Sequence, residues 1–195
     1  MHRRTLLTLG LCASAGLVSA ALAQPTGGEA LFDGRDLDAW TALGDANWRI
    51  VDGVAQADTG VGHLVSKETF ANFHLRAEVW IDPQANSGVF IRAANPGEVN
   101  AQNAYEVNLF DERPDPTYGT GAIVDLAKVD PMPRAAGKWN VLEIRAQGDR
   151  FDVWLNGVQT VTGARDAKRA SGRISLQRGA GMGVVKFRKV DVRPL

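Results

Sequence analysis

The chain has 195 residues, of which 45% are hydrophobic and 23% are charged, with 22 basic and 22 acidic residues. This balance lacks the clustered basic excess of proteins that bind nucleic acid or anionic membranes, so we expect no nucleic-acid partner. The single cysteine, Cys12, lies close to the N-terminus. The rest of the chain therefore has no cysteine nucleophile, thiolate zinc site or disulfide.

Residues 1–23 have the composition of an export signal. Arg3-Arg4 precedes an apolar stretch from Leu6 to Val18, and Ala21-Leu22-Ala23 supplies small residues at the two positions that a signal peptidase requires. We expect cleavage before Gln24 and a mature protein in the periplasm or outside the cell, by either twin-arginine or general secretory export. The apolar stretch is shorter than the roughly 20 residues of a spanning helix, so no membrane attachment is expected after cleavage.

Residues 24–195 are predicted to form a single domain. Removal of residues 1–23 takes away two arginines and no acidic residue, which leaves a net charge of about −2. A chain of this length can bury a substantial core without disulfides.

Short alternating segments separated by glycine-rich turns indicate an all-β domain, because no segment keeps a helical period. Hairpins are predicted at Asp52-Gly53 and at Asn156-Gly157, since these dipeptides accept the positive φ angles of tight turns. Between them, Phe73 to Ile81 alternates apolar and polar residues along its whole length. Further strands are predicted, in chain order, at residues 86–92, 105–111, 138–146, 172–177 and 184–192. About ten strands in one domain predict a two-sheet sandwich or jelly roll.

Two longer connections interrupt this spacing. The segment from Glu112 to Gly137 contains four prolines, and residues 94–103 form the second connection. Long connections in a compact domain are commonly functional. Residues 122–124 are compatible with one more short strand. Because both connections border the segments 86–92 and 105–111, we expect them to rim the same cleft.

The segments 86–92 and 105–111 carry the most informative polar side chains. With the strand period of two, their apolar residues point to one side, while Arg92, Glu106 and Asn108 share the other. A charged face on a sheet whose other side is core is a candidate ligand surface. Arg92 and Glu106 are also compatible with a plain cross-strand ion pair.

Motifs of one protein family follow one another through nearly the whole mature chain. In order, they are Leu31-Phe32-Asp33-Gly34, Trp48 with Asp52-Gly53, Phe73-His74-Leu75, Asn86-Ser87-Gly88 to Arg92, Tyr105-Glu106-Val107 to Asp111, Thr120-Gly121-Ala122-Ile123, Lys138-Trp139-Asn140, Leu155-Asn156-Gly157, Gly172 to Gln177 and Val185-Lys186-Phe187-Arg188. Each motif is weak alone, but their succession resembles the 3-keto-disaccharide hydrolase domain family, formerly a domain of unknown function. The resemblance implies an all-β, two-sheet jelly-roll sandwich of the concanavalin A-like lectin/glucanase type.

The resemblance also implies chemistry on sugars oxidised at carbon 3. A ketone there acidifies the hydrogen on carbon 2, so a base can remove it and the enolate can expel the glycosidic oxygen. Glu106 is the first candidate for base or acid, Arg92 for the clamp on the enolate, and Asp111 for a third catalytic group. The substrate-binding candidates on the same surface are Glu78, Asn108, His74, Trp80 and Gln177. The alternative function is a non-catalytic carbohydrate-binding module on the same scaffold.

Several of these residues have simpler interpretations. Glu78 is also typical of a solvated strand position, Asp111 of a turn cap, and the isolated His63 and His74 of surface or packing roles. Trp80 can stack on a sugar or cap the edge of the sheet. The other aromatic residues of this type, which fit core positions, are Trp40, Trp48, Trp139 and Trp154.

The chain departs from many relatives directly after Gln177. Relatives often carry a histidine there, whereas this chain continues with Arg178-Gly179. With only two histidines left in residues 24–195, we predict no transition-metal site and no cofactor. A calcium ion held by carboxylates and carbonyls is compatible with the sequence.

Overall fold

The computed structural model describes residues 28–195. The predicted export signal at residues 1–23 lies outside this range. Within the range, none of the helices has the length and apolar character needed to cross a membrane.

The described chain consists of strands joined by turns and one short 3₁₀ helix, η1 (Pro116–Tyr118). The strands are β1 (Glu29–Phe32), β2 (Trp40–Gly44), β3 (Arg49–Val51), β4 (Val54–Ala57), β5 (Gly62–Phe70), β6 (Phe73–Ile81), β7 (Ser87–Ala93), β8 (Tyr105–Leu109), β9 (Trp139–Gln147), β10 (Arg150–Leu155), β11 (Val158–Arg165), β12 (Gly172–Arg178) and β13 (Val185–Pro194). Both predicted hairpins are present, as β3–β4 and β10–β11. Asp52 and Asn156 adopt the positive φ angles, 52° each, that the first position of such a turn requires.

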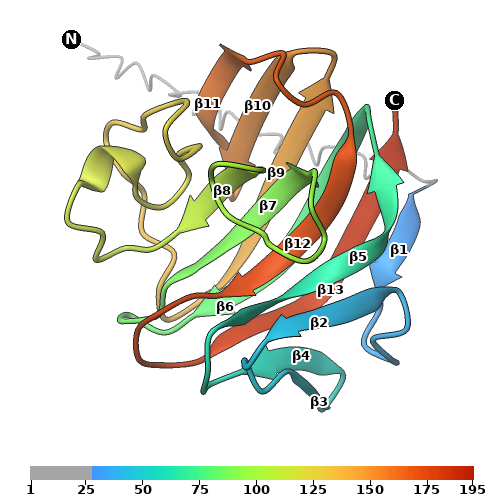
Figure 1. The fold of residues 1–195 in the computed structure, drawn as a ribbon. Helices are drawn as coiled ribbons and strands as arrows, with labels where there is room; N and C mark the ends of the chain where they lie inside the picture. The colour runs from blue at the N-terminus through green and yellow to red at the C-terminus, as the bar shows by residue number, and fades with distance from the viewer. Residues whose placement is uncertain (1–27) are drawn as a thin grey trace, which may run out of the picture.

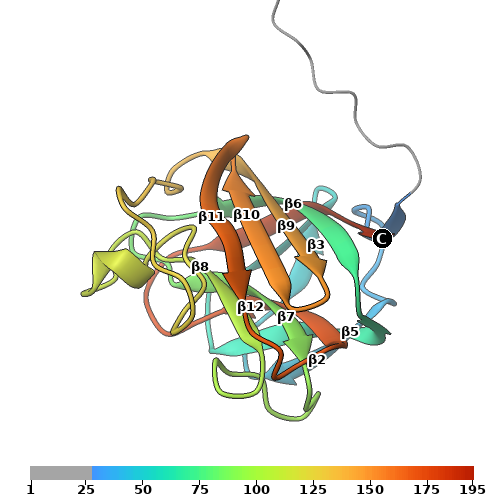
Figure 2. The same ribbon diagram turned by 90° about the horizontal axis from the view of Figure 1, so that it is seen from above.

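The strands form two antiparallel sheets that lie one in front of the other (Figure 1). Sheet A has the order β11-β10-β9-β6-β13-β4-β3, with β1 paired to β13, and sheet B has the order β2-β5-β12-β7-β8. Figure 2 shows the same two layers from above. The predicted all-β, two-sheet jelly-roll sandwich is confirmed.

The core lies between the two sheets. Along β6, residues alternate without exception between buried and partly exposed positions, as the sequence pattern predicts. One continuous hydrophobic cluster joins the inner faces of both sheets, for example Leu75 and Ile144 from sheet A with Val107 and Ile174 from sheet B. Trp40 belongs to this core, and Trp48 packs against it.

The connection between β8 and β9, residues 110–138, folds back along the free edge of β8 (Figure 1). Asn108 N donates to Ala122 O at 3.0 Å, and Val124 N donates to Glu106 O at 2.9 Å. The expected short strand at residues 122–124 is reduced to single bridges from Ile123 to Val107 and Ala127. This segment nevertheless protects the edge of sheet B and holds the connection beside Glu106.

Candidate functional site

A set of polar side chains lies on the outer face of sheet B, and we call it the sheet B face. Cross-strand pairing aligns Gln177, Gly88 and Asn108 in one row, and Ser175, Phe90 and Glu106 in the next. His63 of β5 pairs with Gln177 and extends the first row. The set consists of His63, Gly88, Phe90, Glu106, Asn108, Ser175 and Gln177. Three candidates named from sequence, Glu106, Asn108 and Gln177, are therefore brought together here.

The Glu106 carboxyl group leans over Gly88, between the two amide side chains of the first row. A Cβ atom built on Gly88 would lie 3.3 Å from both Cγ and Oε1 of Glu106, so the carboxyl group occupies the space that a side chain would fill. Burial raises the pKa of Glu106 to about 7, while Arg113 lowers it and Asp125 raises it further. Glu106 is consequently divided between acid and base forms near neutral pH, as a general acid–base catalyst requires.

The side-chain amides of Asn108 and Gln177, on either side of Glu106, each have an oxygen that accepts no hydrogen bond from the part of the chain that the structure describes. Asn108 Nδ2 donates to Tyr118 O at 2.8 Å, which leaves Oδ1 of the same amide directed elsewhere. Among the described residues, Asn108 Oδ1 and Gln177 Oε1 are buried and accept no hydrogen bond. Unpaired buried acceptors are costly. A ligand rich in hydroxyl donors would satisfy both.

His63 supplies a neutral imidazole at the end of the first row. Its Nδ1 lies 2.9 Å from Ser175 Oγ, and its ring meets the ring of Phe90 edge-on with 5.2 Å between centroids. Burial lowers the pKa of His63 to about 4, so the ring is uncharged at neutral pH. The sequence does not single out His63 as a site residue, because an isolated histidine gives no signal until β5 and β12 are paired.

Both long connections border the sheet B face. Val99 and Ala104 of the β7–β8 connection pack on Phe90 and Val65 in a second hydrophobic cluster. The β8–β9 connection brings Arg113 and Asp125 close enough to influence the pKa of Glu106. Arg113 is the cation that lowers the pKa of this carboxyl group. The strand pattern does not single it out, because Arg113 follows the strand instead of lying on it.

The expectation that Arg92 shares a face with Glu106 is wrong. The pairing of β7 with β12 contains an irregularity beside Arg92, where Arg173 pairs with Ala93 but Ser175 pairs with Phe90. Such a bulge adds a residue and reverses the alternation, and Arg92 adopts a φ of 53°. Arg92 therefore points into the sandwich, where it is fully buried.

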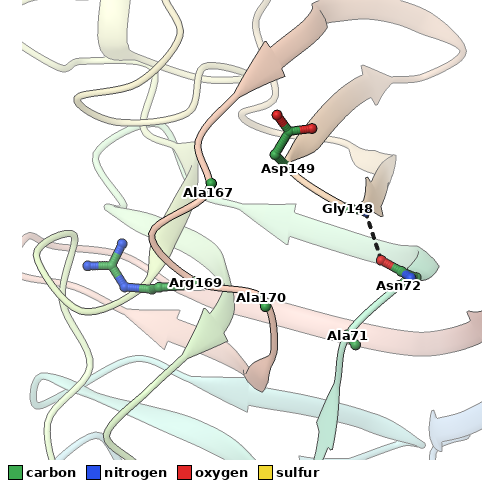
Figure 3. A pocket seen from close by; sticks show the side chains of 7 residues that line it. All are labelled: Ala71, Asn72, Gly148, Asp149, Ala167, Arg169 and Ala170. Carbon is green, nitrogen blue, oxygen red and sulfur yellow. Dashed lines mark hydrogen bonds between the residues drawn. The ribbon is translucent and has the colours of Figure 1, made fainter.

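The Arg92 guanidinium group joins three connections at one end of the sandwich. It donates to Ala71 O at 2.6 Å, Gly148 O at 2.7 Å and Arg169 O at 2.9 Å, and it lies 5.1 Å from the centroid of the Phe151 ring. The same three carbonyl-bearing residues line an outer pocket of 310 Å³ (Figure 3). In that pocket Asn72 Oδ1 accepts a hydrogen bond from Gly148 N at 2.8 Å. Arg92 does not line the pocket, and its contacts are structural.

The Asp111 carboxylate is also buried, and its hydrogen bonds are made within the protein. It is 5% exposed, and its carboxylate accepts hydrogen bonds from Thr120 Oγ1 at 2.6 Å and from the amides of Ala135 and Ala136 at 3.0 and 2.9 Å. These bonds tie the two ends of the β8–β9 connection together. The simpler interpretation of Asp111, a cap for the following loop, fits this geometry.

Glu78, His74 and Trp80 lie on the outer face of sheet A, so the expectation that they share a surface with Glu106 is wrong. Glu78 binds Arg76 at 2.8 Å and Arg188 at 2.5 Å. All three residues alternate with core residues of β6, and the sandwich separates the outer face of sheet A from that of sheet B. Alternation in the sequence predicts the two faces of a strand but not the sheet to which the strand belongs. Trp139 and Trp154, which fit core positions in the sequence, are partly exposed on sheet A.

Residues 28–195 contain no group of three or more His, Cys, Asp or Glu side chains arranged to hold a metal ion. The polar groups around Glu106 that could bind a ligand are mainly side-chain amides. Amides suit the hydroxyl groups of a ligand better than a tightly bound transition metal.

Comparisons with known proteins give one family match. The family model of the 3-keto-alpha-glucoside-1,2-lyase-like domain matches residues 27–193. No curated protein matches the sequence. A solved structure of a candidate glycosyl hydrolase from Parabacteroides distasonis ATCC 8503 superposes with a TM-score of 0.73 at 23% identity, over 87% of this chain and 100% of that chain.

Two further solved structures share the fold. The carbohydrate binding module CBM66 from Bacillus subtilis has a TM-score of 0.60 at 18% identity, over 80% of this chain and 95% of that one. The β-glucanase of Bacillus licheniformis has a TM-score of 0.62 at 12% identity, over 88% and 100%. At such identities the likeness concerns the fold alone. The family match, by contrast, spans nearly the whole described chain, and this protein belongs to the 3-keto-alpha-glucoside-1,2-lyase-like domain family, as its ordered motifs predict.

Proposed function

We propose that the protein cleaves 3-keto-glycosides on the sheet B face, with Glu106 as the general base. The family match and the glycosyl hydrolase and glucanase neighbours support a carbohydrate-related function. The observation that carries the proposal is the Glu106 carboxyl group, with its pKa raised to about 7 and with unpartnered amide acceptors on both sides. The acceptors suit sugar hydroxyl groups, and the carboxylate suits a weakly acidic C–H bond.

The reaction follows from these groups in two stages. Glu106 removes the proton on carbon 2, and the electrons of the C–H bond form an enolate with the ketone at carbon 3. Arg113, the cation close to Glu106, stabilises the enolate oxygen. The enolate then expels the glycosidic oxygen from carbon 1, and the proton that Glu106 has taken passes to that oxygen, which releases the second sugar and restores the carboxylate. Water adds across the new double bond, with hydroxyl to carbon 1 and hydrogen to carbon 2, for a net hydrolysis.

The test is turnover of a 3-keto-disaccharide by the purified mature chain in heavy water. We expect release of 3-keto-hexose that carries deuterium at carbon 2, because elimination replaces that hydrogen and direct hydrolysis does not. A reaction without enzyme measures spontaneous exchange. Parallel reactions with a chelator and with added calcium measure any dependence on that ion. With residues 1–23 as an export signal, the reaction would take place in the periplasm or outside the cell.

Two results would contradict the proposal. Saturable sugar binding without turnover, under all metal conditions, would favour the carbohydrate-binding module. Turnover without deuterium at carbon 2 would favour ordinary glycoside hydrolysis, for which two carboxyl groups are needed.

Substitution of Gly88 by alanine is expected to lower kcat/KM at least about tenfold. The new Cβ would lie 3.2 Å from Val107 O and 3.3 Å from Glu106 Cγ and Oε1, so the carboxyl group would have to shift by a few tenths of an ångström. A displacement near 1 Å can cost roughly 100-fold, so a smaller shift should still be measurable. The matched control is Gly97→Ala in the exposed β7–β8 connection, where the new Cβ would meet only Asn95 Oδ1 at 3.4 Å. Steady-state kinetics on both variants check the prediction, and equal rates would show that the position of Glu106 is unimportant.

A further inference from the structure

A second polar pocket lies on the outer face of sheet A, on the other side of the sandwich from Glu106. Its volume is 310 Å³, and it is lined by His74, Arg145, Trp154, Arg193 and Leu195. We call it the arginine pocket. Its volume is close to the lower end of ligand-binding pockets, which suits one sugar residue.

Strand register places the basic side chains of the pocket in one row. Arg193 of β13 pairs with His74 of β6, and His74 pairs with Arg145 of β9. Core residues precede or follow each of the three in the chain, so all three side chains point outward. These core neighbours are Val192, Phe73, Leu75, Ile144 and Ala146. Adjacent strands lie about 4.8 Å apart, and the two arginines therefore flank the imidazole ring.

The arginines of the pocket differ from several neighbouring cations on this face, which form ion pairs. Arg76 and Arg188 bind Glu78, and Lys189 binds Asp191 at 3.2 Å. Within residues 28–195, neither arginine of the pocket forms an ion pair, and Arg193 Nε is buried without a hydrogen-bond partner. Arg145 donates only to the neutral side chain of Gln147, at 2.5 Å, so among the described residues the pocket presents two guanidinium groups that no carboxylate pairs with and one buried donor without an acceptor.

The pKa of His74 is influenced by the same two arginines. Its Nε2 lies 3.1 Å from Glu143 Oε2, which favours the charged ring. The pKa of His74 is nevertheless below its ordinary value, mainly because of burial and also because Arg193 and Arg145 add positive charge. Two carboxylates lie nearby, but Glu143 binds the imidazole ring, and Asp152, which pairs across the strands with Arg145, is bound by Arg150 at 2.9 Å. Neither forms an ion pair with the two guanidinium groups.

We propose that the arginine pocket binds an acidic sugar, whose carboxylate is held by Arg145 and Arg193 and whose ring lies against Trp154. The planar guanidinium group matches a carboxylate with two parallel hydrogen bonds. The partly exposed indole of Trp154 offers an apolar platform for the ring, with its polar edge toward water. This site is independent of the proposed reaction at Glu106. It gives the protein a means to hold uronic-acid polysaccharides while the sheet B face acts on another sugar.

The experiment titrates trigalacturonate into the mature chain, with calorimetry for affinity and the indole N–H resonance of Trp154 for location. Maltotriose serves as the neutral sugar, and sodium sulfate as an anion without a sugar ring. We expect trigalacturonate to shift the Trp154 resonance and to bind at least about tenfold more tightly than either comparison ligand. Equal binding of maltotriose would overturn the role of charge, and equal binding of sulfate would overturn the role of the ring.

Variants locate the site. Arg145→Gln, at an exposed position, is expected to weaken trigalacturonate binding at least about tenfold, and Trp154→Leu to weaken it as well. Arg188→Gln makes the same charge change on the same face but outside the pocket, and it should alter affinity less than twofold. Glu106→Gln should leave this binding intact whether or not the enzyme turns over 3-keto-sugars. Absence of trigalacturonate binding by the wild type, or equal losses in Arg145→Gln and Arg188→Gln, would refute the proposal.

Discussion

Substitution of Glu106 by glutamine is expected to lower kcat/KM for a 3-keto-disaccharide at least about 100-fold, with no loss of folded structure. General acid–base catalysis contributes roughly 100- to 10,000-fold, and glutamine keeps the shape of the side chain but cannot accept the proton from carbon 2. The matched control is Glu112→Gln, an exposed residue of the β8–β9 connection, which should keep wild-type kinetics. Rates within a fewfold of wild type in Glu106→Gln would exclude Glu106 as the base.

The pH dependence of the wild type gives an independent measurement. Because the base form of Glu106 is needed and its pKa is about 7, kcat/KM should rise with pH and level off above that value. His63, with a pKa of about 4, stays neutral over this range and adds no step near pH 7. The step near pH 7 should be absent from the residual activity of Glu106→Gln. A wild-type rate that falls as pH rises through 7 would instead indicate that Glu106 acts as the acid.

Stability should change in the direction opposite to activity. The pKa of Glu106 is higher in the folded protein than the ordinary 4.5, so its contribution to stability is fully present below pH 4.5 and is lost as pH rises through about 7. At pH 8 the folded state keeps a poorly solvated carboxylate, at a cost on the order of 3 kcal/mol. Glu106→Gln should therefore be more stable than wild type at pH 8, and this advantage should shrink at pH 5. Urea unfolding at the two pH values checks this, and an advantage that does not depend on pH would contradict the raised pKa.

Local sequence patterns predicted most of the fold for physical reasons. Asp52-Gly53 and Asn156-Gly157 define hairpins because few other residues accept their backbone angles. The alternation from Phe73 to Ile81 defines β6 because one side of that strand is entirely buried. The strands β1, β2 and β5 lacked such signals and were not predicted. In β5, buried residues run consecutively from Gly62 to Ser66, so the alternation is hidden.

The candidate site was predicted in part because alternation specifies a face but not a sheet. Glu106 and Asn108 lie two residues apart on one strand, so their shared face followed directly. Gln177 also has the expected orientation, and β12 happens to neighbour β7. Glu78 has an equally clear alternation, but β6 belongs to the other sheet. Contacts between strands far apart in the sequence, such as that of His63 with Ser175, required the topology.

Arg92 is the residue for which alternation failed, and its variants test the corrected assignment. Arg92→Met should destabilise the protein by at least about 3 kcal/mol, because the carbonyls of Ala71, Gly148 and Arg169 would lose a charged donor inside the sandwich. Arg92→Lys should fall between this variant and wild type, since an ammonium group keeps the charge but cannot reproduce the planar fork. Urea unfolding gives the free energies, and kinetics on the folded fraction give kcat and KM.

Arg113 provides the matched comparison, because it is partly exposed and acts on Glu106. Arg113→Met should change the free energy of unfolding by less than about 1 kcal/mol, as is usual for surface positions. It should lower kcat at least about tenfold, since the enolate loses its cation, and it should move the pH step of Glu106 upward. Folded Arg92→Lys should instead keep kcat and KM near wild type. If Arg92→Lys lost kcat with unchanged stability while Arg113→Met remained active, the guanidinium that stabilises the enolate would be Arg92, and the bulge in β7 would have to open during catalysis.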